Sequence, residues 1–121
     1  MEFNEYQKKA NSLAIYLDSL KNKYDLPDEI WKLLGITYAG LGLGEVGEIQ
    51  NRIKKIIRDS GGELTDEVRK ILIKELGDVL WYVAAMCKEL DVTMNYVAKE
   101  NLDKLISRKK RGTIYGSGDN R

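Results

Sequence analysis

Two stretches decide the fold: GEVGEIQNRIKKIIRD at residues 44–59 and KELGDVLWYV at residues 74–83. Each stretch carries two acidic residues three positions apart, and the pairs are Glu45 with Glu48 and Glu75 with Asp78. Residues three apart lie on the same face of an α-helix, so two such helices packed together bring four carboxylates to one place. Carboxylate oxygens are the ligands that Mg²⁺ prefers in proteins. The sequence therefore predicts a metal site between two neighbouring helices.

Both acidic pairs lie on helix faces that are otherwise largely apolar. Stepping by three and four residues, the first face carries Ile30, Leu34, Leu41, Glu45, Glu48, Arg52 and Ile56, and the second carries Val68, Ile71, Glu75, Asp78, Tyr82 and Met86. An unpaired charge in such surroundings is costly, so lysine, arginine or a metal ion must compensate it. One acidic pair at this spacing is also typical of an ordinary charged surface helix. Two pairs on apolar faces favour the metal site.

The composition indicates a single globular domain and excludes several classes of function. The chain has 121 residues, of which 32% are charged and 43% hydrophobic, and its net charge of +1 gives no electrostatic reason to expect a nucleic-acid or membrane partner. The absence of histidine excludes imidazole catalysis and the usual zinc sites. A lone Cys87 allows no disulfide within one chain, and neither a signal peptide nor a membrane span is evident. We therefore expect a cytoplasmic protein.

The periodicity of the chain predicts helices and no strands. We expect helices over residues 4–22, 28–58, 65–90 and 94–109. Asn4, with Gln7 as its capping-box partner, Thr65 and Thr93 are the expected N-caps, and Gly112 ends the last helix. These elements predict an all-α domain of four to five helices over residues 1–112. Residues 113–121 form a polar tail that we expect to be mobile unless it closes over a site or a neighbouring subunit.

The second expected helix contains glycines, each of which costs up to about 1 kcal/mol in a helix interior. They are Gly35, Gly40, Gly42, Gly44 and Gly47. One explanation is a kink near residues 40–44 or close packing against another helix. The other is that missing side chains leave room for a metal and its ligand beside the first acidic pair. Both explanations stay open.

The last helix carries a polar face made of Asn101, Lys104 and Arg108. An amide and two cations are suited to phosphate oxygens. The same face is also what a solvated helix has near its C-terminus, where cations are favoured. Tyr82 follows Asp78 by one helical turn, where it either stacks on a base or belongs to the core.

Three motifs in order resemble the MazG-like all-α nucleoside triphosphate pyrophosphohydrolases. They are GLGLGEVGEI (40–49), KELGDVLWYVAAM (74–86) and NLDKLISRKKRG (101–112), and the resemblance covers about residues 36–112. It implies a helical bundle that assembles as a dimer or tetramer. It also implies Mg²⁺, with Mn²⁺ as a substitute, held by Glu45, Glu48, Glu75 and Asp78. The implied substrate contacts are Lys55, Tyr82, Asn101, Lys104 and Arg108. Many family members have a further glutamate where this chain has Gly44.

The resemblance implies hydrolysis of a nucleoside or deoxynucleoside triphosphate to the monophosphate and pyrophosphate, in the service of nucleotide-pool cleaning. Glu48 or Glu45 would then activate the attacking water. A non-catalytic helical module that binds a partner or itself is the main alternative. Within the enzyme class, a nucleoside diphosphate or an alarmone is the alternative substrate.

Apolar residues beside the acidic face indicate self-association independently of the resemblance. Val46, Ile49, Ile53 and Ile57 recur at helical spacing next to that face. One layer of four helices cannot easily bury both faces of the same helix. We therefore expect an oligomer.

Overall fold

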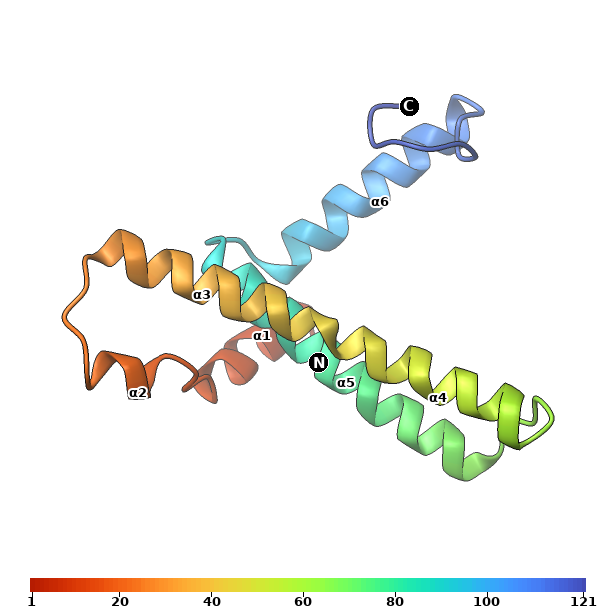
Figure 1. Cartoon of the computed structure of the whole chain (residues 1–121). Helices are drawn as coiled ribbons and strands as arrows, with labels where there is room; N and C mark the ends of the chain where they lie inside the picture. Colours follow the sequence, from red (N-terminus) through yellow and green to blue (C-terminus); the bar gives the residue numbers. More distant parts are fainter.

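The computed structural model describes residues 1–121, and every regular element in it is helical. In chain order the elements are α1 (Phe3–Ser12), α2 (Asp18–Lys21), α3 (Asp28–Gly42), the 3₁₀ turn η1 (Leu43–Glu45), α4 (Val46–Asp59), α5 (Asp66–Glu89) and α6 (Met94–Lys110). The predicted all-α class is confirmed. Figure 1 shows α3, η1 and α4 as one long rod that lies along α5, whereas α6 extends away from both.

All helical elements except α2 pack against α5, which contacts α1, α3, η1, α4 and α6. The buried apolar core is small and lies where α1, the C-terminal half of α5 and the start of α6 meet. Its members are Ala10, Ala84, Cys87 and Met94. Only ten of the 121 residues are buried, and no large side chain is fully buried. None of the helices is long and apolar enough to span a membrane.

Large apolar side chains remain exposed on several helices of the single chain. They include Leu41, Val46, Ile53, Ile57, Ile73, Leu76, Leu102 and Ile106. Three of these, Val46, Ile53 and Ile57, are the apolar residues that the sequence analysis noted beside the first acidic pair. Exposed apolar surface on this scale is typical of faces that pack against another protein.

The N-terminal region differs from the single helix predicted over residues 4–22. The helix ends at Ser12, and a separate turn, α2, follows. The capping roles predicted for Asn4 and Gln7 are wrong, because Glu2 occupies the N-cap position. The Asn4 side chain instead accepts a hydrogen bond from the backbone N–H of Asn95 at 3.1 Å. The buried Gln7 amide donates to the Val92 carbonyl at 2.9 Å and accepts from the Met94 N–H at 2.8 Å.

These hydrogen bonds fix the junction between α5 and α6. Gln7 gives a hydrogen-bond partner to the Val92 carbonyl and to the Met94 N–H, which have no partner within the helices. Each of these bonds avoids a desolvation cost of about 1–3 kcal/mol. Because Gln7 sits on α1, it ties α1 to the start of α6. The direction in which α6 leaves the body of the chain is therefore set by α1.

The caps of the last two helices agree with the sequence. The Thr65 hydroxyl accepts from the N–H of Val68 at 3.2 Å, and the Thr93 hydroxyl accepts from the N–H of Tyr96 at 3.1 Å. At the end of α6, Gly112 adopts a φ of 69°. The N–H groups of Gly112 and Thr113 then bond to the carbonyls of Lys109 and Arg108, which closes the helix in a Schellman motif.

The glycine-rich rod is interrupted by a 3₁₀ turn and is closely packed against α5. The predicted single helix over residues 28–58 is divided by η1, which lies in the region where the kink was expected. Gly35 and Gly42 face α5 so closely that an added Cβ would lie 2.2 Å from the Glu89 carboxylate and 2.0 Å from the Tyr82 ring. A Cβ on Gly44 or Gly47 would meet nothing within 4 Å. Close packing therefore explains Gly35 and Gly42, and open space adjoins the glycines beside the first acids.

Candidate metal and phosphate site

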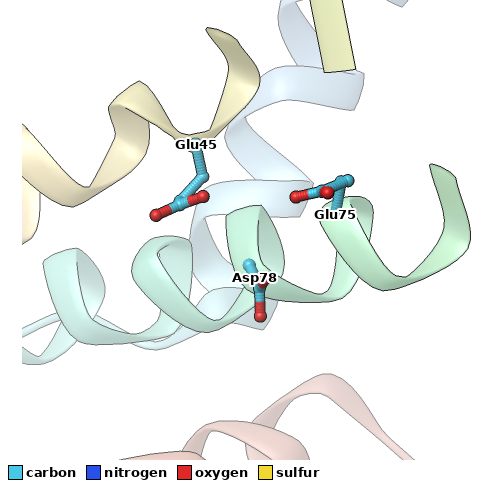
Figure 2. A group of neighbouring side chains, drawn as sticks. All are labelled: Glu45, Glu75 and Asp78. Atoms are coloured by element: carbon cyan, nitrogen blue, oxygen red, sulfur yellow. The ribbon is translucent and has the colours of Figure 1, made fainter. Parts of the chain in front are cut away.

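Three of the predicted acidic residues meet where η1 crosses α5. Glu45 ends η1, and Glu75 and Asp78 lie one turn apart on α5, so the carboxylates come from two facing elements (Figure 2). One oxygen from each of the three lies within 4.8 Å of the other two. Glu45 and Glu75 are partly buried, whereas Asp78 is exposed. The helical spacing on α5 thus acts as the sequence predicts, and η1 supplies the third carboxylate.

The donor set fits a hard divalent cation. All three donors are carboxylate oxygens, which suit Mg²⁺, Mn²⁺ or Ca²⁺ and do not suit a soft metal. Oxygens bound to one such ion lie at most about 4–5 Å apart, which is twice a metal–oxygen bond of about 2.1–2.6 Å. The separation of up to 4.8 Å lies within that range for the longer Ca²⁺–oxygen bonds, whereas Mg²⁺–oxygen bonds of about 2.1 Å require the three carboxylates to move slightly closer together. Glu45, Glu75 and Asp78 are therefore the residues that would hold a cation.

Arg52 is a member of this site that the sequence did not single out as functional. Its Nε atom lies 4.0 Å from a carboxylate oxygen of Glu75, whose side chain is only 16% exposed. Arg52 therefore supplies part of the positive charge that buried carboxylates require. It lies on the same helical face as Glu48, four residues further on, and that spacing was the signal available in the sequence.

Glu48 and Lys55 lie on α4 outside the carboxylate cluster. Glu48 follows Glu45 by one turn, and it is exposed and absent from the group of oxygens described above. Lys55 is exposed further along α4. The hydrogen bond from Arg58 lowers the pKa of Asp59, and the charge of Lys55 lowers it further. The structure thus brings together three of the four predicted metal ligands and leaves Glu48 on the solvent side.

Tyr82 lies beside the carboxylates, in the space that Gly42 leaves open. Its pKa is raised, first by a side-chain hydrogen bond with Tyr38, then by burial and by the negative charges nearby, among them Glu45 and Asp78. The Tyr82 ring lies 6.3 Å from the Tyr38 ring and 5.1 Å from the Trp81 ring, measured between centroids. Tyr82 is therefore an aromatic wall of the candidate site that also packs against its neighbours.

The polar face of α6 lies apart from the carboxylates of its own chain. α6 contacts α1 and α5 but neither η1 nor α4, and it extends away from the α4–α5 pair (Figure 1). Asn101 and Lys104 are exposed, whereas Arg108 is buried beneath the C-terminal tail. A single chain therefore presents a carboxylate cluster and a separate cationic helix face.

Comparison with known proteins identifies the matching region. A family model described as the MazG nucleotide pyrophosphohydrolase domain matches residues 37–113. The chain is also similar to the "Gene 37 protein" of Mycobacterium phage L5, with 46% identity over 122 residues that cover 100% of both chains. No solved structure matches the chain. The matched region contains the carboxylate cluster and the polar face of α6.

Proposed function

Since the chain belongs to the MazG nucleotide pyrophosphohydrolase domain family, we propose that it hydrolyses a nucleoside or deoxynucleoside triphosphate with the help of Mg²⁺. Water attacks the α-phosphorus, the bond from that phosphorus to the bridging oxygen breaks, and the products are the monophosphate and pyrophosphate. The observation that carries this proposal is the cluster of Glu45, Glu75 and Asp78 inside the matched region. Removal of non-standard or surplus nucleotides is the proposed cellular task.

The carboxylates divide into two roles under this proposal. Glu45, Glu75 and Asp78 hold the cation, and Arg52 pairs with Glu75 and helps to keep it in place. A bound Mg²⁺ supplies neutralisation of the charge on the phosphate oxygens. Glu48 is not committed to the cluster, so we assign it as the base that accepts the proton of the attacking water. Tyr82 lies at the edge of the cluster, where its ring can stack on the base of the nucleotide.

We further propose that the site is completed by a second copy of the chain in a dimer or tetramer. Asn101, Lys104 and Arg108 carry the charge and hydrogen-bond donors that a triphosphate needs, but they lie away from the carboxylates of their own chain. The exposed apolar side chains of α4, α5 and α6 need a partner surface. Docking a second copy answers both needs, because it covers these faces and brings α6 to the partner's carboxylates.

The activity is tested by screening common and damaged nucleoside triphosphates with Mg²⁺ or Mn²⁺ and identifying the products. We expect the monophosphate and pyrophosphate in equal amounts, and no turnover when a chelator removes the cation. Nucleoside diphosphates and alarmones in the same screen test the alternative substrates. Release of orthophosphate in place of pyrophosphate would contradict cleavage between the α and β phosphates.

The shared site also predicts that two nearly inactive variants regain activity when they are co-expressed. Glu75→Gln damages the carboxylate cluster, and Lys104→Ala removes a phosphate contact worth about 1.5–3 kcal/mol, so each variant alone should be nearly inactive. Co-expressed with different tags, they form mixed oligomers in which one site has both damaged parts and the other has neither. We expect such a mixture to regain about a quarter of the wild-type activity.

The controls for this experiment are the two variants mixed at the moment of assay and the oligomeric state by light scattering. If all parts of the site come from one chain, co-expression gives only the mean of the two separate activities. A stable monomer at micromolar concentration would contradict both the oligomer and the shared site.

A further inference from the structure

The C-terminal tail, residues 113–121, turns back over the end of α6 and engages two of its cations. Arg108 donates through Nη2 to the carbonyls of Gly118 at 3.3 Å and Asp119 at 3.0 Å, and to the Asp119 carboxylate at 3.3 Å. The Nζ atom of Lys104 lies 3.6 Å from the same carboxylate. A carboxylate thus already occupies the two cations that the proposed function assigns to phosphate.

The tail is held in this position as one closed loop. Arg121 donates to the carbonyls of Thr113, Ile114 and Gly118, and Arg111 donates to the Arg121 carbonyl. Gly116 and Gly118 adopt φ values of 111° and 88°, which other residues rarely adopt, and these allow the chain to reverse direction. These contacts hold the segment together as one loop against the end of α6.

The tail supplies hydrogen-bond acceptors for only part of the Arg108 guanidinium. Arg108 is 4% exposed, yet its Nε atom is buried without a hydrogen-bond partner, and all three bonds to the tail use Nη2. A guanidinium presents a fork that matches two oxygens of a phosphate group. The Asp119 side chain is 86% exposed, so the competing carboxylate lies at the surface and can be displaced. The hydrogen bond from Arg108, followed by the charge of Lys104, lowers the pKa of Asp119, so this carboxylate stays charged at neutral pH.

We propose that the tail is an autoinhibitory strap whose Asp119 carboxylate occupies the phosphate site on α6 until a triphosphate displaces it. This inference rests on the proposed function, because that function assigns Lys104 and Arg108 to phosphate. A site that is covered for most of the time binds its ligand more weakly, by the fraction of molecules in which it is open. The strap therefore raises the concentration of triphosphate that the protein needs.

The test measures the binding of inorganic tripolyphosphate to the full chain by calorimetry without divalent cation. Asp119→Asn weakens the strap, and we expect it to lower the Kd by about threefold to tenfold, a range typical of a partly exposed charge pair. The matched control is Asp103→Asn on α6, the helix that carries Lys104 and Arg108. It removes the same charge, but Asp103 pairs with Lys99 and not with Lys104 or Arg108.

Each outcome tests the strap independently of whether the protein hydrolyses nucleotides. Equal Kd values for Asp119→Asn and Asp103→Asn would overturn the strap even in an active enzyme. Weaker binding by Asp119→Asn would show that the tail is part of the phosphate site and would overturn the proposed inhibition. The proposal would also be overturned if the wild type and both variants failed to bind tripolyphosphate. Tighter binding by Asp119→Asn in a protein that hydrolyses no nucleotide would support the strap and contradict the proposed enzyme.

Discussion

Asp78→Asn is expected to abolish hydrolysis while leaving the metal-free fold intact or slightly more stable. Asp78 is one of three carboxylates within 4.8 Å of one another, and it is the exposed one. Like charges at this distance repel, so neutralising one should raise the free energy of unfolding without metal by up to about 1 kcal/mol. Losing a ligand of the cation should lower kcat by at least about a hundredfold.

Thermal unfolding with and without Mg²⁺ separates a metal site from a structural cluster. Mg²⁺ at a hundred times its Kd stabilises a folded protein by about 2.7 kcal/mol, so the melting temperature of the wild type should rise. This rise should disappear in Asp78→Asn and persist in the control Asp103→Asn. If the acids only pair with cations of a second chain, Asp78→Asn is destabilised without metal and Mg²⁺ has no effect on the wild type. That pair of results would contradict the proposed metal-dependent hydrolysis.

Asp78 is a cleaner choice for this test than Glu75. Glu75 is partly buried and has Arg52 at 4.0 Å, so Glu75→Gln also leaves a cation without its partner. The loss of stability from that effect would mask the relief of repulsion. Asp78 has no such cation, so the sign of its stability change reports on the carboxylates alone.

Local features of this fold were predictable from the sequence, and features that depend on distant partners were not. Thr65 and Thr93 cap helices through N–H groups three residues away, so their role follows from the local sequence. Asn4 and Gln7 have equally good capping sequences, but they bond to groups near residue 93 instead. The burial of Gln7 beneath the α5–α6 junction decides its partners, and periodicity carries no information about that junction.

The same distinction holds within the candidate site. Helical spacing correctly places Glu75 and Asp78 together, and Glu45 joins them from the end of the 3₁₀ turn η1. Periodicity defines the face of a helix but not its direction in space, so it could not show that α6 leaves the body of the chain. It likewise could not show that Asp119 reaches Lys104 and Arg108, because the tail has no regular spacing.

Glu48→Gln is expected to lower kcat by about 10²–10⁴-fold while preserving the stabilisation by Mg²⁺. Glu48 is exposed one turn beyond Glu45 and lies outside the carboxylate cluster, so its oxygens are free to accept a proton from water. Glutamine keeps the shape of the side chain but cannot take that proton. Because Glu48 acts on water rather than on the nucleotide, KM should change little.

Steady-state kinetics and the Mg²⁺-dependent melting temperature, measured on the same preparation, check this assignment. The control is Glu63→Gln, which makes the same chemical change at an exposed position between α4 and α5. If Glu48→Gln loses the Mg²⁺ effect together with turnover, Glu48 is a fourth ligand, as the family resemblance implies, and its side chain must turn toward Glu75 when the cation binds. Unchanged kcat would exclude both roles and leave Glu45 as the only carboxylate of the first pair that serves the site.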